Sequence, residues 1–231
     1  MSENDSLLAQ MFSALMAILR KEFLLEYRAR YGLNAILLFV LVSVSLVAFS
    51  VSAELLTSEL AAALFWNTAF FAALSALQRA FVSEVERGTM LFLRLSAPPT
   101  AIFLGKLVYN FLLSLLVNGA IAALYLGLLS LTIRNATIFL ATLALGSASI
   151  AIVLTLISAI VANATSRGSL FATLSFIPLL IPIFATTRAM RAATEEDAPF
   201  FRASTELEIL AAYALVTFFV ALMLYEFAWE E

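Results

Sequence analysis

Hydrophobic residues form six long uninterrupted stretches along the chain, at residues 34–51, 60–77, 107–131, 137–162, 170–186 and 209–225. None of these stretches contains Asp, Glu, Lys, Arg or His, so every charged residue lies between or outside them. An α-helix of about 20 apolar residues is long enough to cross the hydrocarbon core of a bilayer. The pattern therefore predicts an all-α integral membrane protein with six transmembrane helices.

The composition leaves little room for anything besides these helices. Of the 231 residues, 63% are hydrophobic and 13% are charged, which is far from the composition of soluble domains. We expect a single transmembrane domain over residues 1–231, surrounded by the lipid bilayer. The absence of Cys and His removes disulfides and imidazole or thiolate metal ligands. The net charge is only −3 and no basic stretch is interleaved with aromatic residues, so nucleic acid is not an expected partner.

Basic residues are unevenly divided between the two ends of the predicted bundle. The segment before the first span, the joint between spans two and three and the joint between spans four and five carry four, four and one of the 13 basic residues. The opposite joints carry the remaining four, Arg134, Arg188, Arg191 and Arg202. Cytoplasmic loops carry the excess of Lys and Arg. We therefore expect both termini and residues 78–105 in the cytoplasm, and residues 188–206 on the outside.

Residues 7–31 have apolar positions at helical spacing, with charges that become denser toward Arg30. This pattern is typical of an amphipathic helix. One interpretation places the helix in the cytoplasmic interface, with its arginines near anionic headgroups. The other makes it an elbow that leads into the first span and also braces a partner protein.

The joint 78–105 is the longest on the cytoplasmic side and has a pattern of its own. Phe81 and Val85 lie four residues apart and predict the apolar face of a short amphipathic helix, with polar residues around it. Gly88 then permits a sharp exit from the helix, and an almost wholly apolar segment follows at residues 90–95. The segment could lie in the membrane interface, or it could fit a groove on a cytoplasmic partner. The candidate coupling residues for the second alternative are Phe81, Glu84, Val85, Glu86, Arg87, Gly88 and Thr89.

Small residues recur every fourth position in two of the predicted spans. Span three has the stripe Gly119, Ala123 and Gly127, and span four has the stripe Ser147, Ala151, Thr155 and Ala159. Small side chains at this spacing let helix backbones approach closely, so we expect both stripes to be packing faces. Packing within one chain is the default expectation, and packing between two copies in a homodimer is the alternative.

Two prolines, Pro178 and Pro182, interrupt the fifth span. Each proline lacks the N–H that would bond to the carbonyl four residues earlier, so carbonyl groups are freed inside the membrane. The two residues lie four apart on one face of the helix, and we expect them to bend it.

The spans lack the residues that membrane catalysis or proton coupling would require. No His or Lys stands near a serine in a span to activate it, and no carboxylate or arginine lies at depth. No phosphate-binding loop of the Walker A type occurs either, because Gly105-Lys106 lacks the preceding glycine and the following Ser or Thr. We therefore expect a protein that is not itself an enzyme and receives its energy from another polypeptide. Six spans with a cytoplasmic amphipathic segment fit the permease subunit of an ATP-binding-cassette transporter.

Several segments resemble one known family of such permeases. Residues 81–90 and 93–98, followed by residues 101–106, are similar to the cytoplasmic loop and the start of the third span in the heme exporter protein B family, CcmB. The Pro-rich residues 178–182 and the N-terminal Arg20-Lys21-Glu22 also resemble that family. The chain differs from the usual pattern at Arg87 and Leu91, where the family often has acidic residues.

The resemblance implies an ABC-2-type permease of cytochrome c maturation in a bacterial inner membrane. It implies that residues 81–89 couple to a CcmA-like ATP-binding subunit, within a complex that contains a CcmC-like haem-handling protein and serves a CcmE-like haem chaperone. No cofactor is expected on this chain itself: haem would be a substrate of the complex, and ATP would bind to the partner. Two alternatives remain, a permease that exports a lipid, polysaccharide or drug, and a membrane assembly scaffold without transport activity.

Overall fold

The structure is a computed structural model that describes residues 3–51, 55–162, 164, 167–195 and 200–230. These residues form helices without any strand within the described ranges, which confirms the predicted all-α class. The helices are α1 (Glu3–Ala29), α2 (Tyr31–Ser50), α3 (Ser58–Leu77), α4 (Arg79–Glu86), α5 (Met90–Ser96), α6 (Pro99–Leu128), α7 (Ala136–Val161), α8 (Arg167–Thr194) and α9 (Phe200–Glu230).

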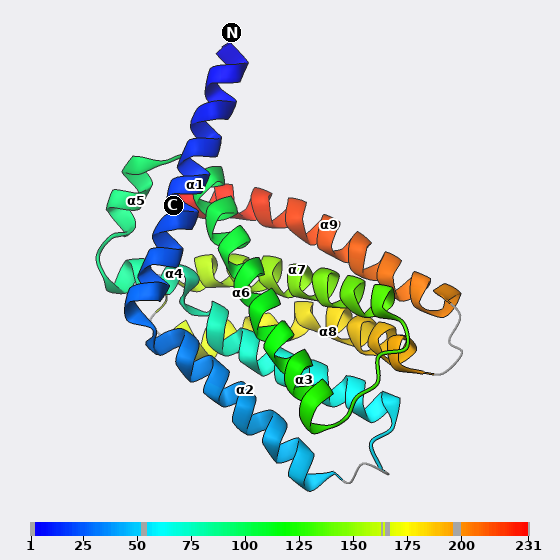
Figure 1. Ribbon diagram of the computed structural model, residues 1–231. Helices are drawn as coiled ribbons and strands as arrows, with labels where there is room; N and C mark the ends of the chain where they lie inside the picture. The colour runs from blue at the N-terminus through cyan, green and yellow to red at the C-terminus, as the bar shows by residue number, and fades with distance from the viewer. Residues whose placement is uncertain (1–2, 52–54, 163, 165–166, 196–199, 231) are drawn as a thin grey trace.

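Six of the helices are long and apolar enough to cross a membrane. These six spans correspond to α2, α3, α6, α7, α8 and α9, and they follow the order of the six apolar stretches of the sequence. The two short helices α4 and α5 lie at the same end of the bundle as the start of α2 and the end of α9 (Figure 1). The end of α2 and the start of α3, the end of α6 and the start of α7, and the end of α8 and the start of α9 lie at the opposite end (Figure 1).

The helices extend further than the apolar stretches suggested. Helix α6 begins at Pro99, eight residues before the predicted start of the third span at residue 107. Proline is favoured at the first position of a helix, and the residues that follow Pro99 continue the helix into the span. Most of the joint 188–206 is helical as well, since α8 runs to Thr194 and α9 begins at Phe200. Its arginines pair with carboxylates: Arg191 bonds to Glu195 at 2.6 Å and to Glu59 at 3.2 Å.

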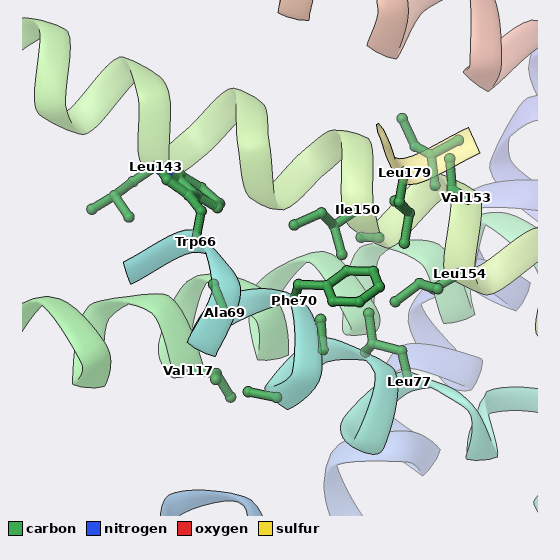
Figure 2. Packing of buried hydrophobic residues seen from close by; sticks show 14 of the residues in the cluster. Trp66, Ala69, Phe70, Leu77, Val117, Leu143, Ile150, Val153, Leu154 and Leu179 are labelled. Atoms are coloured by element: carbon green, nitrogen blue, oxygen red, sulfur yellow. The ribbon is translucent and has the colours of Figure 1, made fainter. Parts of the chain in front are cut away.

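The core of the bundle forms where α3, α7 and α8 meet. Figure 2 shows Trp66 and Phe70 of α3 beside Leu143 and Ile150 of α7. A Cβ added to Gly146 of α7 would lie 2.4 Å from the Trp66 ring, so only glycine permits this approach. The close packing fixes α3 against α7 and thereby positions α4, which follows α3 directly.

Helix α1 meets the bundle at the start of α6. A Cβ added to Gly105 would lie 2.9 Å from Ile18 Cγ2 and 3.2 Å from the Leu15 carbonyl oxygen, so the backbone of α6 approaches α1 very closely. Apolar residues elsewhere on α1, among them Phe12 and Phe23, are exposed. Helix α1 is therefore an elbow that is anchored to the bundle near Gly105 and leaves apolar surface available to lipid or to a partner.

Candidate coupling site and its buried ion network

The break between α3 and α4 is held by one serine from another helix. The Phe81 N–H donates to Ser158 Oγ at 3.1 Å, and the Ser158 hydroxyl donates to the Gln78 carbonyl at 3.0 Å. A helix break leaves backbone groups without intrahelical partners, and buried groups of this kind need other partners. Ser158 is fully buried in α7, so it provides them and fixes the direction in which α4 leaves the bundle.

Phe81 is the main apolar anchor of α4. Its side chain is fully buried, and its ring centroid lies 5.5 Å from that of Tyr225 in α9. The Tyr225 ring also lies 4.9 Å from that of Phe103 in α6, and Lys106 Nζ lies 5.1 Å from the centroid of Phe81. Phe81 therefore joins α4 to α6 and α9 inside the chain, and it is not available to a partner protein.

Four charged side chains form a network beneath α4. Lys106 Nζ lies 2.7 Å from Glu22 Oε1 and 3.0 Å from Glu84 Oε1, and it also donates to the Ala80 carbonyl at 2.6 Å. Lys21 bonds to the same Glu84 oxygen and lies 3.1 Å from Glu22 Oε1. Two cations thus face two carboxylates, and the network has no net charge.

The network is deeply placed for charged groups. The side chain of Lys106 is 1% exposed, that of Glu84 is 5% and that of Glu22 is 11%, whereas that of Lys21 is 35%. Removing one partner from a buried ion pair is costly, because the other charge then stays buried without compensation. The network therefore ties the elbow α1, the short helix α4 and the start of α6 together in one arrangement.

Lys21 is the member of the network closest to solvent. Burial lowers the pKa of its ammonium group, but the Glu22 and Glu84 carboxylates raise it, and the net pKa lies above its ordinary value. The group is therefore charged throughout the physiological range, and the network has no proton to exchange at neutral pH through Lys21.

The turn after α4 is built by Gly88 and Thr89. Gly88 has a φ of 69°, in the left-handed region that favours glycine, so it makes the sharp exit anticipated from the sequence. The Thr89 N–H donates to the Glu84 carbonyl at 2.9 Å, and its hydroxyl donates to Glu84 Oε2 at 2.6 Å. Thr89 thus closes the turn and orients the same carboxylate that binds both lysines.

Helix α5, which follows this turn, presents large apolar side chains to the outside. Leu91, Phe92 and Leu95 are exposed by 69%, 74% and 80%, while Leu93 is buried against the bundle. Glu86 and Arg87 at the end of α4 are exposed beside this turn. Together these five exposed residues, 86, 87, 91, 92 and 95, form what we call the α4–α5 surface.

The structure corrects the placement of two predicted coupling residues. Phe81 and Glu84 were expected on the surface of the loop, but both are buried, because the aromatic cluster and the two lysines hold them inside. Val85 is half-buried against the core. Glu86, Arg87, Gly88 and Thr89 are exposed, so these four remain available to a partner.

The two small-residue stripes have different surroundings. Ser147, Ala151 and Thr155 are buried and Ala159 is half-buried. The first three face α6, where Asn118 donates to Ser147 at 2.8 Å and Asn110 donates to Thr155 at 2.8 Å. The stripe of α6 lies on the outside instead. Gly119, Ala123 and Gly127 are exposed, and a Cβ on either glycine would have no neighbour within 4 Å.

The exposed stripe corrects the expectation that Gly119, Ala123 and Gly127 pack within the chain. The polar face of α6 turns inward instead, because Asn110 and Asn118 donate to hydroxyls of α7, and the small residues are on the other side. Asn67 of α3 is likewise exposed. Packing of the α6 stripe against a second copy stays a prediction.

The prolines of α8 lie inside a continuous helix. Pro182 has no N–H to donate to the Pro178 carbonyl, and the Tyr213 hydroxyl of α9 donates to that carbonyl in its place. The Pro182 carbonyl accepts a further bond from Thr186 Oγ1 at 2.7 Å. The neighbouring helix thus satisfies the carbonyl freed by proline, as membrane proteins require. A bend at Pro178 and Pro182 remains a prediction.

Fold and site together define a multi-pass membrane protein in which a short helix pair at one end is joined to the bundle by a buried ion network. A model of the CcmB protein family matches residues 13–230, nearly the whole chain, and the chain belongs to this family. It is accordingly a heme exporter membrane subunit of a cytochrome c maturation system, and a transporter permease rather than an enzyme. A comparison with curated proteins finds no significant match.

Sequence reasoning missed the ion network because its members are far apart along the chain. Lys21 and Lys106 are the only lysines of the sequence, and all other basic residues are arginines. A compact ammonium fits a closed site that a planar guanidinium would not fill in the same way. The restricted use of lysine was therefore the available signal. Nothing comparable in the sequence distinguishes Ser158 from the other serines in the spans.

Proposed function

We propose that the chain is a permease subunit that binds a separate ATP-binding subunit at the α4–α5 surface. Conformational changes of that subunit would be transferred through this surface to the membrane-spanning helices. The supporting observation is the contrast between the two sides of this segment. Its inner side is fixed to α6, α7 and α9 by Phe81, Glu84 and Ser158, whereas its outer side exposes Leu91, Phe92 and Leu95. A rigid attachment with an exposed apolar face can transfer the movement of a bound partner to the spans.

The expected partners follow from the same proposal. A CcmA-like ATPase would bind the α4–α5 surface, with a CcmC-like membrane protein and a CcmE-like haem chaperone completing the complex. Haem would be handled as the substrate of the complex, either exported or released with its chaperone when ATP is hydrolysed. The family match favours this role over export of a lipid, polysaccharide or drug. Stimulation of ATP hydrolysis in the reconstituted complex would distinguish it from a scaffold without transport activity.

Exposed and buried aromatic residues provide a direct test of coupling. Phe92→Ser should reduce recovery of the ATPase with the permease and leave thermal stability unchanged, because Phe92 is 74% exposed and does not belong to the buried core. Phe81→Ala should reduce both the recovery of the ATPase and the thermal stability of the permease, because it removes the internal anchor of α4. Phe49→Ser, at the far end of α2 and 93% exposed, is the matched control.

Recovery is measured by affinity purification of the ATPase, normalised to the membrane level of the permease. Unchanged recovery with Phe92→Ser and with Leu95→Ser would show that α5 lies in the lipid interface, and the coupling role would then be wrong. Loss of recovery with Phe49→Ser to the same extent would also contradict the proposal, because it would attribute the effect to any lost apolar contact.

We propose in addition that both termini and the α4–α5 surface are cytoplasmic, in a bacterial inner membrane. The nine-to-four division of basic residues supports this orientation. The chain has no Cys, so single cysteines report location directly. Thr132→Cys should react with an impermeant thiol reagent in intact cells, whereas Ser96→Cys should react only after permeabilisation. The reverse pattern would overturn the orientation.

A further inference from the structure

A cavity of about 640 Å³ opens at the end of the bundle that carries α4, between the elbow of α1 and α2 on one side and α3, α4 and α6 on the other. One part of its wall is polar, with Gln78, Arg79 and Arg87 among the lining residues. Another part is apolar and includes Ile36, Phe39 and Leu113. The cavity is therefore amphipathic, and its polar part lies where the spanning helix α3 ends, at Leu77.

The charged side chains that line the cavity differ in whether they have a partner within the chain. The Glu22 carboxylate is bound by Lys106 and Lys21. Glu26 accepts from the Leu33 N–H at 2.7 Å and so stabilises the beginning of α2. Glu86 faces Arg167 at 3.9 Å. The guanidinium groups of Arg79 and Arg87, in contrast, have no ion-pair or hydrogen-bond partner among the described residues, so two cations on the cavity wall are open to an anion.

We propose that this cavity binds a membrane phospholipid, with the phosphate at Arg79 and Arg87 and one acyl chain along Ile36, Phe39 and Leu113. Guanidinium groups bind phosphate oxygens well, and basic pockets between spanning helices at the membrane surface suit lipid headgroups. The order of the lining residues along the direction of the spans also fits a lipid. The arginines lie beyond the end of α3, at headgroup level, and the apolar residues lie along the spans.

The volume and shape of the cavity support the same occupant. A space of about 640 Å³ is within the range of small-molecule pockets and accommodates a headgroup with the first part of a chain. A free inorganic phosphate would use only the polar part. Because the cavity is bordered by α1, α2 and α4, a bound lipid would contact both the elbow and α4.

Binding is tested on the full chain in detergent after removal of endogenous lipid. The probe is phosphatidylglycerol with a fluorescent group on one acyl chain, titrated at low ionic strength. Each arginine near an anionic lipid contributes about fivefold to affinity, so Arg79→Gln/Arg87→Gln should weaken binding about 25-fold. The control Arg20→Gln/Arg28→Gln removes two exposed arginines of α1 that do not line the cavity, and should change the Kd less than about twofold.

Two further measurements separate a lipid from its components. Ala35→Trp should weaken binding while both arginines remain, because a large ring would occupy the apolar part beside Ala35, which lines the cavity. Diacylglycerol with the same fluorescent chain should bind much more weakly than the phospholipid, and inorganic phosphate should compete only at far higher concentration.

Equal binding of the phospholipid and diacylglycerol would remove the phosphate from the proposal and overturn it. Equal competition by inorganic phosphate would assign the site to the free anion and overturn it as well. Binding of haem that survives loss of both arginines, without binding of phospholipid, would assign the cavity to the pigment instead. None of these results depends on the ATPase, so they are independent of the coupling experiment.

Discussion

Replacing Lys106 by Met removes the cation that makes the most contacts in the buried network. The ammonium group bonds to Glu22, Glu84 and the Ala80 carbonyl, at 2.7, 3.0 and 2.6 Å. Met keeps most of the volume of the side chain and none of the charge. The change therefore tests the electrostatic contribution of the network and leaves the packing around Phe81 largely in place.

The expected loss of stability follows from burial of the partners. Breaking a buried ion pair by removing one partner costs about 3–5 kcal/mol, because the other charge remains buried. Lys21 still lies 3.1 Å from Glu22 Oε1 and bonds to Glu84, so we expect the lower end of this range. For a protein of this size, about 3 kcal/mol corresponds to a decrease in Tm of about 6–12 °C.

The measurement is the loss of the monodisperse peak in size-exclusion chromatography after heating the detergent-solubilised chain. Lys106→Met/Glu84→Gln should regain a substantial part of the lost stability, because the second change removes one uncompensated carboxylate. Lys21→Met is the matched control: its side chain is partly exposed, and its loss should cost about 1 kcal/mol or less.

Two outcomes would refute this reasoning. If Lys106→Met melts within about 1 °C of the wild type, the network contributes too little to join α1, α4 and α6. If Glu84→Gln fails to restore stability to Lys106→Met but destabilises the wild type by the same amount, the two groups do not interact energetically.

Three other predictions concern packing, the helix break and pH. Gly146→Ala should lower stability by about 1–3 kcal/mol through overpacking, whereas Gly119→Ala, with open space around it, should not; thermal unfolding of both variants checks this. Ser158→Ala should cost about 1–3 kcal/mol by removing the partner of the Phe81 N–H and the Gln78 carbonyl, and should release α4 to proteolysis; Ser149→Ala, whose hydroxyl bonds to the Leu145 carbonyl of its own helix, should not release α4. The pKa of Lys21 is raised in the folded chain, so its contribution is complete below its unfolded pKa, near 10.4, and is lost as pH rises through the folded value. Melting curves above about pH 10.5 should therefore show a steeper loss for the wild type than for Lys21→Arg, which keeps its charge, and parallel curves would contradict the assignment.

The sequence by itself determined the class of the protein and the order of its spans. Backbone groups in a bilayer must be paired within the chain, so an uncharged apolar stretch of sufficient length has only one common solution, a helix. The same local logic located the turn at Gly88, because a sharp left-handed exit favours glycine. The resemblance of residues 81–106 to one family was also local, and it agrees with the family match over residues 13–230.

Only the tertiary structure decided which face of each helix is inside. Gly119 and Ser147 belong to stripes with the same spacing, yet one is exposed and the other is buried, because the amides of α6 pair with hydroxyls of α7. Helical periodicity places Phe81 on the apolar face of α4 but does not say what covers that face. The cover comes from Tyr225 and Lys106, which are distant in sequence, and an ion network such as that of Lys106 with Glu22 exists only after the chain has folded.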